Sequence, residues 1–439
     1  MYQININPLT HTKKEKLVVS SSVRSIFSQS NTVLNYQTVG NSIHFSRNVY
    51  KENPYPIYWT QIYRMMQGVT DWRARVGTFT TPWNAPSNPL YRMPELKFIN
   101  DSLSDLMDQR AVELYNEAKR TNKKLAVMWS GGIDSTAVLV ALLKNIPTHE
   151  HGMIEVICNS HSIFENPQFF IKYIVGKLKV QSSILILITN SFLDNYILLH
   201  GDPADCLFGP SISRMQYAIR NNLHHTSWQK NINLIKTPLI NILSHKENFK
   251  GWDFVEINDK YIEEFSKNCV EWFCEKVSKN IIENKQEKNL TTITDWYWWT
   301  YFNFKWEFSC QRPFLYNNSG EAISFEKQQE WAKNTFFNTD KFQQWSYSNL
   351  KTLIPASDMS QHKIIIKKYI YEYDHDDNYF YLKPKVGSKS PSQFIEGGGD
   401  PRIIGNPFYY DQNWVGHVSN EDDSFVAKSS RMLLDGYRG

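Results

Sequence analysis

The chain has 439 residues, 41% of them hydrophobic, which is enough for roughly two or three domains with a sizeable core. Its formal net charge is only +4, and this argues against a dedicated nucleic-acid-binding protein, which usually carries a clear basic excess. We therefore expect no nucleic-acid partner, although the balance leaves room for a local basic groove.

The five cysteines exclude two further classes. Their number is odd and no CxxC pair occurs, so neither a disulfide framework nor a structural zinc site is expected. The opening segment MYQININPLTHTKKEK has no long apolar core, and no apolar run reaches the roughly 18 residues of a membrane span. We therefore expect a cytoplasmic protein that has no membrane partner.

The first part of the chain, residues 1–95, predicts a small mixed region. Two short β-like runs (16–20 and 32–39) precede a Pro-rich loop, TTPWNAPSNP, and no catalytic pattern occurs there. Residues 94–122 have a helical pattern that places Leu106, Val112 and Leu114 near one face, with charged residues opposite.

Strand and helix patterns alternate over residues 123–210. Strands are predicted at 125–129 and 153–158, each followed by a helix, at 135–143 and 166–178. This alternation predicts an α/β fold: a parallel twisted sheet with flanking helices. Two more strand-like runs, SILILI (183–188) and YILL (196–199), are only eight residues apart, whereas a parallel crossover needs about a dozen. Either one run is not a strand or the connection is unusual.

Residues 211–350 predict a helical, aromatic-rich part. In the segment 259–281, large apolar residues recur at helical spacing, which favours core packing over a cofactor site, and WYWWTYFNFKWEF is expected to be buried between helices. The stripe consists of Tyr261, Phe265, Cys269, Trp272 and Phe273. The predicted domains are 1–95, 96–395 and a C-terminal tail, 396–439.

The segment SGGIDS, residues 130–135, occurs where a predicted strand meets a predicted helix. Gly131 and Gly132 would allow a tight turn with N–H groups aimed at an anion, and Ser130 and Ser135 could donate to phosphate oxygens. Asp134 would repel a bare phosphate, so its sensible role is to hold Mg²⁺ against the phosphates. The alternative is an ordinary turn with a Ser or Asp cap. The Walker pattern GxxxxGK[ST] is absent.

SGGIDS resembles the SGGxDS pyrophosphate loop of the N-type ATP pyrophosphatases, which cleave ATP between the α and β phosphates. The resemblance implies an adenine nucleotide α-hydrolase-like sheet with ATP on the loop. We expect the adenine at neighbouring strand ends, near Met128, Trp129 and the segment from Cys158 to Ser160, although core packing is the other interpretation of Met128.

HGDPADCLFG, residues 200–209, resembles the SGEGADELFGG segment of the asparagine synthetase family. The matching residues are Gly201, Ala204, Asp205, Leu207, Phe208 and Gly209. The resemblance implies that Asp205 shares Mg²⁺ with Asp134 and that Gly201 belongs to the nucleotide site. Asp202 keeps the charge of a family glutamate on a shorter arm and is a catalytic candidate. Pro203 and Cys206 depart from the family pattern. The alternative is an Asx-rich loop that caps a helix.

Two later segments follow in the family's order. CQRPFLY (310–316) is similar to the family's VRVPFLD, with Tyr316 in place of an aspartate. In the basic segment before GS, Lys385 takes the place of the family's catalytic lysine, which contacts the α-phosphate. An ammonium there would stabilise charge that grows in the transition state. The alternatives are a buried turn and a solvated basic run that includes Lys383 and Lys389.

Together the landmarks resemble an asparagine-synthetase-like synthetase domain. The resemblance implies a carbon–nitrogen ligase that uses ATP and Mg²⁺ to adenylate a small-molecule or peptide carboxylate. The family's glutaminase domain starts with a cysteine, whereas here no cysteine precedes Cys158. We expect ammonia, ammonia from a partner glutaminase, or a substrate amine as the donor. The alternatives are a nucleobase- or tRNA-modifying member of the superfamily and a non-catalytic ATP-binding descendant.

Overall fold

The computed structural model describes residues 91–158, 160–182, 188–208, 218–245, 258–306, 309–310, 323–353 and 363–382, together with 18–19, 43–44, Tyr58 and Arg75. The chain divides into two compact units. Unit 1 contains Met1–Ile99, Asp205–Ala332 and Gln343–His362, and unit 2 contains Asn100–Ala204, Lys333–Phe342 and Lys363–Gly439. The domain boundaries given above stay a prediction.

A parallel sheet forms the centre of unit 2. Its strands are β3 (Lys124–Met128), β4 (Ile154–Cys158), β5 (Lys179–Ser182) and β6 (Tyr196–Leu199), in the order β5-β4-β3-β6. Every neighbouring pair is parallel. This confirms the predicted α/β class with a parallel sheet. All five residues of β4 are buried, as expected for a central strand that is covered on both faces.

The strand order reverses between β3 and β6. From β3 the chain builds outwards through β4 to β5, and it then returns to the other side of β3 for β6. In open α/β sheets, ligands bind outside the carboxyl ends of the strands at such a reversal. Val127 of β3 pairs with Leu199 of β6. The segments that follow these two strands, SGGIDS and HGD, therefore begin at the same edge of the sheet.

The third strand differs from the prediction. β5 ends at Ser182, so it lies before the whole SILILI run, of which residues 183–187 are outside the described part. The connection to β6 then covers residues 183–195 and includes α9 (Asn190–Asn195). This length satisfies the need of a parallel crossover for about a dozen residues.

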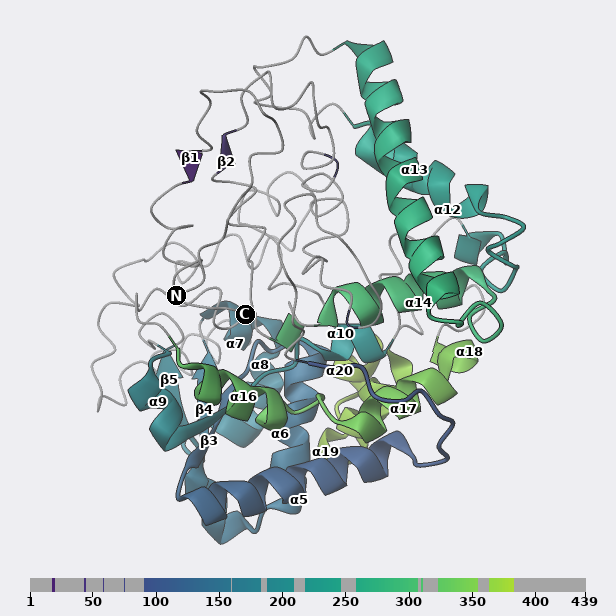
Figure 1. Cartoon of the computed structure of the whole chain (residues 1–439). Helices are drawn as coiled ribbons and strands as arrows, with labels where there is room; N and C mark the ends of the chain where they lie inside the picture. Colours follow the sequence, from purple (N-terminus) through teal and green to yellow (C-terminus); the bar gives the residue numbers. More distant parts are fainter. Residues whose placement is uncertain are drawn as a thin grey trace, which may run out of the picture. The chain divides into compact units, whose positions relative to one another are not determined.

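Helices flank the sheet of unit 2 (Figure 1). α5 (Leu103–Thr121) begins later than predicted, because the Ser102 hydroxyl accepts the Asp105 N–H and caps the helix. Leu106 and Leu114 are buried, but Val112 is 40% exposed, so its predicted place on the buried face was wrong. The remaining elements are α6 (Ile133–Asn145), η1 (Thr148–Met153), α7 (Ser160–Glu165), α8 (Pro167–Phe169), the π-helix η2 (Phe170–Ile174), α19 (Ile364–Asp374) and α20 (Asp377–Leu382). The predicted helix 166–178 is therefore α8 followed by one π-helical turn.

Unit 1 has a helical core. Every residue of α14 (Ile293–Phe304) is buried, which confirms the predicted burial of the aromatic run. The buried indole N–H groups have acceptors: Trp298 donates to Ser346 and Trp299 donates to Asn280. The other elements are the antiparallel pair β1 (Val18–Val19) and β2 (Ile43–His44), α10 (Ala204–Leu207), α12 (Asn233–Leu243), α13 (Asp259–Glu283), α16 (Phe325–Asn334), α17 (Asp340–Ser348) and α18 (Leu350–Leu353).

The aromatic stripe on α13 is only partly internal. Phe265, Cys269 and Phe273 are buried, whereas Tyr261 and Trp272 are half-buried. Across the described part of the chain, no helix is both long and apolar enough to cross a membrane.

Candidate functional site

The SGGIDS segment joins β3 to α6 in unit 2. β3 ends at Met128, and Gly132 is the N-cap residue of α6 with an extended backbone (φ −71°, ψ 164°). Gly132 has no side chain that could cap the first-turn N–H groups, and the positive end of the helix dipole lies at this turn. The junction therefore has the geometry of an anion-binding helix start.

Gly131 is the residue that makes the turn possible. Its φ of +72° lies in the left-handed region, where a side chain is strained. A Cβ atom there would lie 2.2 Å from the Ser162 carbonyl oxygen and 2.7 Å from the Glu165 Cβ. Only glycine allows the loop to lie this close to α7.

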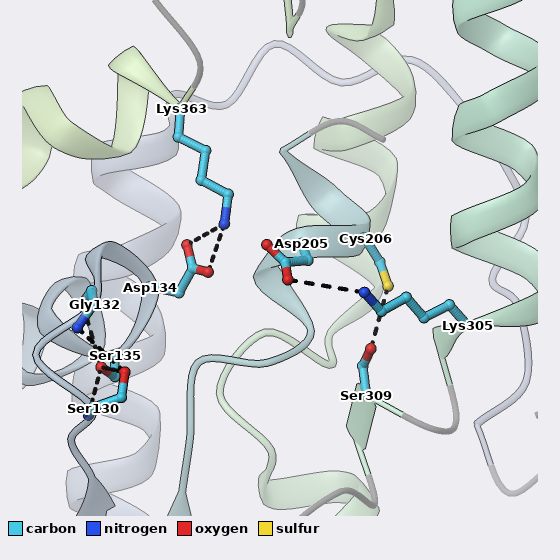
Figure 2. Close-up of polar contacts among 9 residues, drawn as sticks. All are labelled: Ser130, Gly132, Asp134, Ser135, Asp205, Cys206, Lys305, Ser309 and Lys363. Carbon is cyan, nitrogen blue, oxygen red and sulfur yellow. Dashed lines mark hydrogen bonds and ion pairs between the residues drawn. The ribbon is translucent and has the colours of Figure 1, made fainter. Parts of the chain in front are cut away.

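The two serines of the segment have different surroundings (Figure 2). Ser135 is 3% exposed, and its hydroxyl accepts the Ser130 N–H at 3.0 Å. The two hydroxyls are 2.9 Å apart, and the Ser130 hydroxyl accepts the Gly132 N–H at 3.2 Å. Ser130 is exposed, so its hydroxyl can contact a ligand. The buried Ser135 instead stabilises the loop through its hydrogen bond with the Ser130 N–H.

Gly201 is the second residue after β6, and it lies against the same loop. A Cβ atom at this position would lie 2.6 Å from the Ser135 backbone nitrogen and 2.7 Å from the Asp134 carbonyl carbon. The structure thus brings together Gly201 and the SGGIDS segment, which the sequence separates by more than sixty residues. Glycine is required here because both close atoms belong to the backbone.

Asp134 is paired with a lysine that the sequence did not identify. The Lys363 Nζ donates to both carboxylate oxygens of Asp134, at 2.8 and 2.6 Å (Figure 2). The Lys363 side chain is 8% exposed and that of Asp134 is 22% exposed. No local pattern could have predicted this pair, because 229 residues separate the partners.

The HGD segment after β6 carries a second carboxylate of unit 2. Asp202 is half-buried, and one of its oxygens lies 3.9 Å from Nδ1 of the buried His200. The Ala204 N–H donates to the Gly201 carbonyl at 3.0 Å and closes a turn around Asp202. Asp202, the second catalytic candidate, is therefore held at the same edge of the sheet as SGGIDS.

Asp205 belongs to unit 1 and also has a lysine partner. The Lys305 Nζ lies 3.9 Å from an Asp205 carboxylate oxygen, and the Asp205 side chain is 49% exposed (Figure 2). The adjacent Cys206 is buried, with its Sγ 3.7 Å from the Ser309 hydroxyl. Asp205 thus offers an accessible carboxylate, whereas Cys206 is part of the core.

The predicted adenine contacts lie at the ends of β3 and β4. Met128 is half-buried, whereas Cys158 is 1% exposed. The Trp129 ring is buried beside Phe169 and Phe170, and its Nε1–H donates to the Thr136 hydroxyl. Met128 is therefore more accessible than its neighbour Trp129. The contacts with adenine stay a prediction.

The catalytic candidate Lys385, its neighbours Lys383 and Lys389, and residues 312–316 of the family-like segment lie outside the described part. A nearby described residue is Tyr379 of α20. Its hydroxyl lies 3.5 Å from the Gly131 carbonyl oxygen, and burial raises the pKa of this phenol. Lys385 follows six residues later, and six residues span at most about 21 Å, so the length of the chain allows Lys385 to reach the loop.

The sequence assigned Mg²⁺ to the carboxylates of Asp134 and Asp205. Within the described ranges, no group of three or more His, Cys, Asp or Glu residues gathers to hold a metal. Mg²⁺ usually keeps several waters and takes one or two carboxylates plus phosphate oxygens. Each of these two side chains is partly exposed in its own unit, and a metal ion that both hold stays a prediction.

A cavity of about 670 Å³ lies at the opposite edge of the sheet, where β3 and β6 begin. Three lysines line it, and each has a partner: Lys119 with Glu150, Lys123 with the Leu193 carbonyl, and Lys124 with Glu155. The cavity is separated from SGGIDS by the length of β3.

Comparisons of the chain with models of protein families, with curated proteins and with solved structures find no match.

Proposed function

We propose that this chain is an ATP-dependent, AMP-forming amide synthetase of the asparagine synthetase type. The main support is the position of SGGIDS, which joins a central parallel strand to a helix where the strand order reverses. Gly201 lies against the start of that helix, as close packing between the two motifs requires. An ordinary capped turn would need neither the left-handed Gly131 nor the close approach of Gly201.

In this proposal the ATP phosphates bind the helix start. The backbone of Gly131 and Gly132 and the Ser130 hydroxyl donate to phosphate oxygens, while Ser135 holds Ser130 in place. The adenine lies across the ends of β3 and β4, beside Met128, because Cys158 is buried. Asp134 and Asp205 hold Mg²⁺, which neutralises phosphate charge when it is bound with ATP.

The reaction has two steps. A carboxylate oxygen of the substrate attacks the α-phosphorus, and pyrophosphate leaves with the bonding electrons. An amine or ammonia nitrogen then attacks the acyl carbon, AMP leaves, and the nitrogen loses a proton. Lys385 stabilises the growing charge on the α-phosphate oxygens in both steps. Asp202 lies at the same edge of the sheet and is the candidate acceptor for that proton.

An ATP–pyrophosphate exchange assay across a panel of small-molecule and peptide carboxylates tests the proposal. At least one carboxylate should support exchange. Asp134→Asn and Asp205→Asn should each lower the exchange rate by about 10²–10³, the usual result of removing one preorganised charged group. Asp205→Asn should keep the fold, because the Asp205 side chain is 49% exposed. Asp134→Asn leaves the largely buried Lys363 without its carboxylate, so its fold must be checked by circular dichroism before its exchange rate is compared.

Asp108→Asn is the matched control. Asp108 also pairs with a lysine of unit 2, Lys144, at 2.6 Å, but it lies on α5 and away from SGGIDS. Exchange should survive this change even if the melting temperature falls. If Asp134→Asn and Asp108→Asn lowered exchange equally, or if no carboxylate supported exchange, the proposed function would be wrong.

A further inference from the structure

Both carboxylates proposed to hold Mg²⁺ are paired with a lysine of their own unit. In unit 2, the Lys363 ammonium contacts both oxygens of Asp134, at 2.8 and 2.6 Å. In unit 1, Lys305 lies at 3.9 Å from one oxygen of Asp205. The first pair is a short, charge-assisted contact, and the second is a looser ion pair.

Lys363 is fixed in position by the fold. It is the residue before α19 and has a left-handed backbone (φ 57°, ψ 24°), and α19 packs against α6, the helix that carries Asp134. Its side chain is 8% exposed, so the ammonium does not alternate freely between the carboxylate and solvent. The strained backbone and the burial distinguish this pair from a mobile surface ion pair.

We infer that Lys363 makes Asp134 selective for the metal–nucleotide complex over the free metal ion. A free Mg²⁺ ion must reach an Asp134 oxygen at about 2.0–2.1 Å, but both oxygens already accept from one ammonium. Two cations on one carboxylate repel each other. When the ion binds together with ATP, the negative charge of the phosphates offsets the repulsion between the Mg²⁺ ion and the Lys363 ammonium. This inference rests on the proposed function, and it adds an order of binding to it.

We expect Lys305 to have a smaller effect than Lys363 on the binding of free metal. Its ammonium is beyond hydrogen-bonding distance of Asp205, so it should exclude free metal much less than Lys363 does. Lys172 is the control outside the site. It forms a pair with the buried Asp374 at the other end of α19, at 3.1 Å.

The test is to measure the binding of Mn²⁺ to the full-length protein by electron paramagnetic resonance. The measurement is made once without nucleotide and once with α,β-methylene-ATP. The wild type should bind Mn²⁺ weakly alone and well with the nucleotide analogue. Lys363→Gln should bind Mn²⁺ alone at least about tenfold tighter than the wild type, a difference of about 1.4 kcal/mol. Lys363→Arg keeps the charge and should retain the exclusion. Lys305→Gln should show a smaller gain, and Lys172→Gln none.

The outcomes separate this inference from the proposed function. Suppose that circular dichroism shows both proteins to be folded and that the wild type binds Mn²⁺ together with the analogue. Equal binding of free Mn²⁺ to the wild type and to Lys363→Gln would then overturn the inference. A gain that persisted in the Lys363→Gln/Asp134→Asn double variant would also overturn it, since the metal would then bind elsewhere. Failure of the wild type to bind Mn²⁺ with the analogue would contradict the proposed function itself.

Discussion

At the scale of single residues, Lys385 is the lysine that we propose to contact the α-phosphate. Lys385→Ala should slow ATP–pyrophosphate exchange by about 10²–10³ and change ATP affinity little, because an ammonium at the α-phosphate matters most when charge grows there. Exchange rates and nucleotide affinity, measured on the same preparations, check this expectation.

Lys383→Ala and Lys389→Ala are the controls for Lys385. They lie two residues before and four residues after it in the same basic segment. Equal, mild losses at all three positions would indicate a solvated basic run and favour a non-catalytic ATP-binding protein. A deep loss at Lys383 or Lys389 alone would keep the mechanism and move the role to that lysine.

The local pattern predicted which residues surround the loop, but not which of them a ligand can reach. Ser130 and Ser135 are equivalent in the motif, yet one is exposed and the other is buried beneath it. Lys363 gave no signal, since its partner Asp134 is 229 residues away and the contact depends on how α19 packs on α6. Such pairings depend on tertiary structure, which periodicity does not encode.

At the scale of elements, the segment after β6 lies close to the start of α6. Gly201→Ala would place a Cβ within 2.6–2.8 Å of atoms of Asp134 and Ser135, so the loop would have to move. A shift of this size should lower the exchange rate by about 10²-fold, and overpacking should lower the free energy of unfolding by about 1–3 kcal/mol.

Gly152→Ala is the matched control, because a Cβ there meets no atom within 4 Å. This variant should have wild-type exchange and a wild-type or slightly higher melting temperature. Wild-type exchange in Gly201→Ala would contradict the functional role given to this contact.

The amino end of the sheet contains a buried carboxylate on β4. Glu155 is fully buried, pairs with Lys124 at 2.7 Å and with Lys179 at 3.4 Å, and accepts from Gln181 and Tyr196. Burial alone would raise its pKa, but the hydrogen bonds from Lys124 and Gln181 and the nearby lysine charges outweigh burial and lower the pKa below the usual value.

Glu155→Gln should therefore destabilise unit 2 by about 1–3 kcal/mol at neutral pH. A carboxyl whose pKa is lowered in the folded protein stabilises the fold at pH values above its pKa in the unfolded chain, which is about 4.3. This stabilisation is lost as the pH falls through the pKa of the folded protein. Urea unfolding of both proteins across this range should show the difference shrinking towards acid. A constant difference would mean that packing, and not charge, holds Glu155.

The elements that the sequence predicted best are those with continuous apolar runs. β3, β4, β6 and α6 lie within two residues of their predicted positions, because buried strands and helices of a parallel sheet have little polar content. β5 has the sequence KVQS, and its Lys179 and Gln181 contact Glu155. A polar strand of this kind has no apolar signature, so the neighbouring SILILI run was preferred.

At the scale of the whole molecule, the chain returns to the sheet after a long excursion. Unit 2 gains α19 and α20 from residues beyond 362, and Tyr379 of α20 contacts the Gly131 carbonyl. The sequence did not predict this return, because the order of segments along a chain does not show which later segment packs on an earlier one.

The cysteines of the whole chain bear on the source of nitrogen. All five are free and buried. Burial raises the pKa of Cys158 and Cys274 to about 12 and that of Cys206 to about 11, and it raises the pKa of Cys269 well above the usual value. Attack on the glutamine amide by cysteine needs an accessible thiolate, which these environments disfavour.

The purified chain should therefore release no ammonia from glutamine, and glutamine alone should not support amide formation. Ammonium chloride, or an amine on the substrate, should support AMP release with the carboxylate that gives pyrophosphate exchange. The measurement is AMP production with each nitrogen source, with ammonia followed in parallel. As a control, replacing all five cysteines by serine or alanine in a variant that still folds should leave the ammonium-dependent rate unchanged. Ammonia release from glutamine by the wild type, lost in that variant, would show that one of these buried thiols becomes exposed and reactive during turnover.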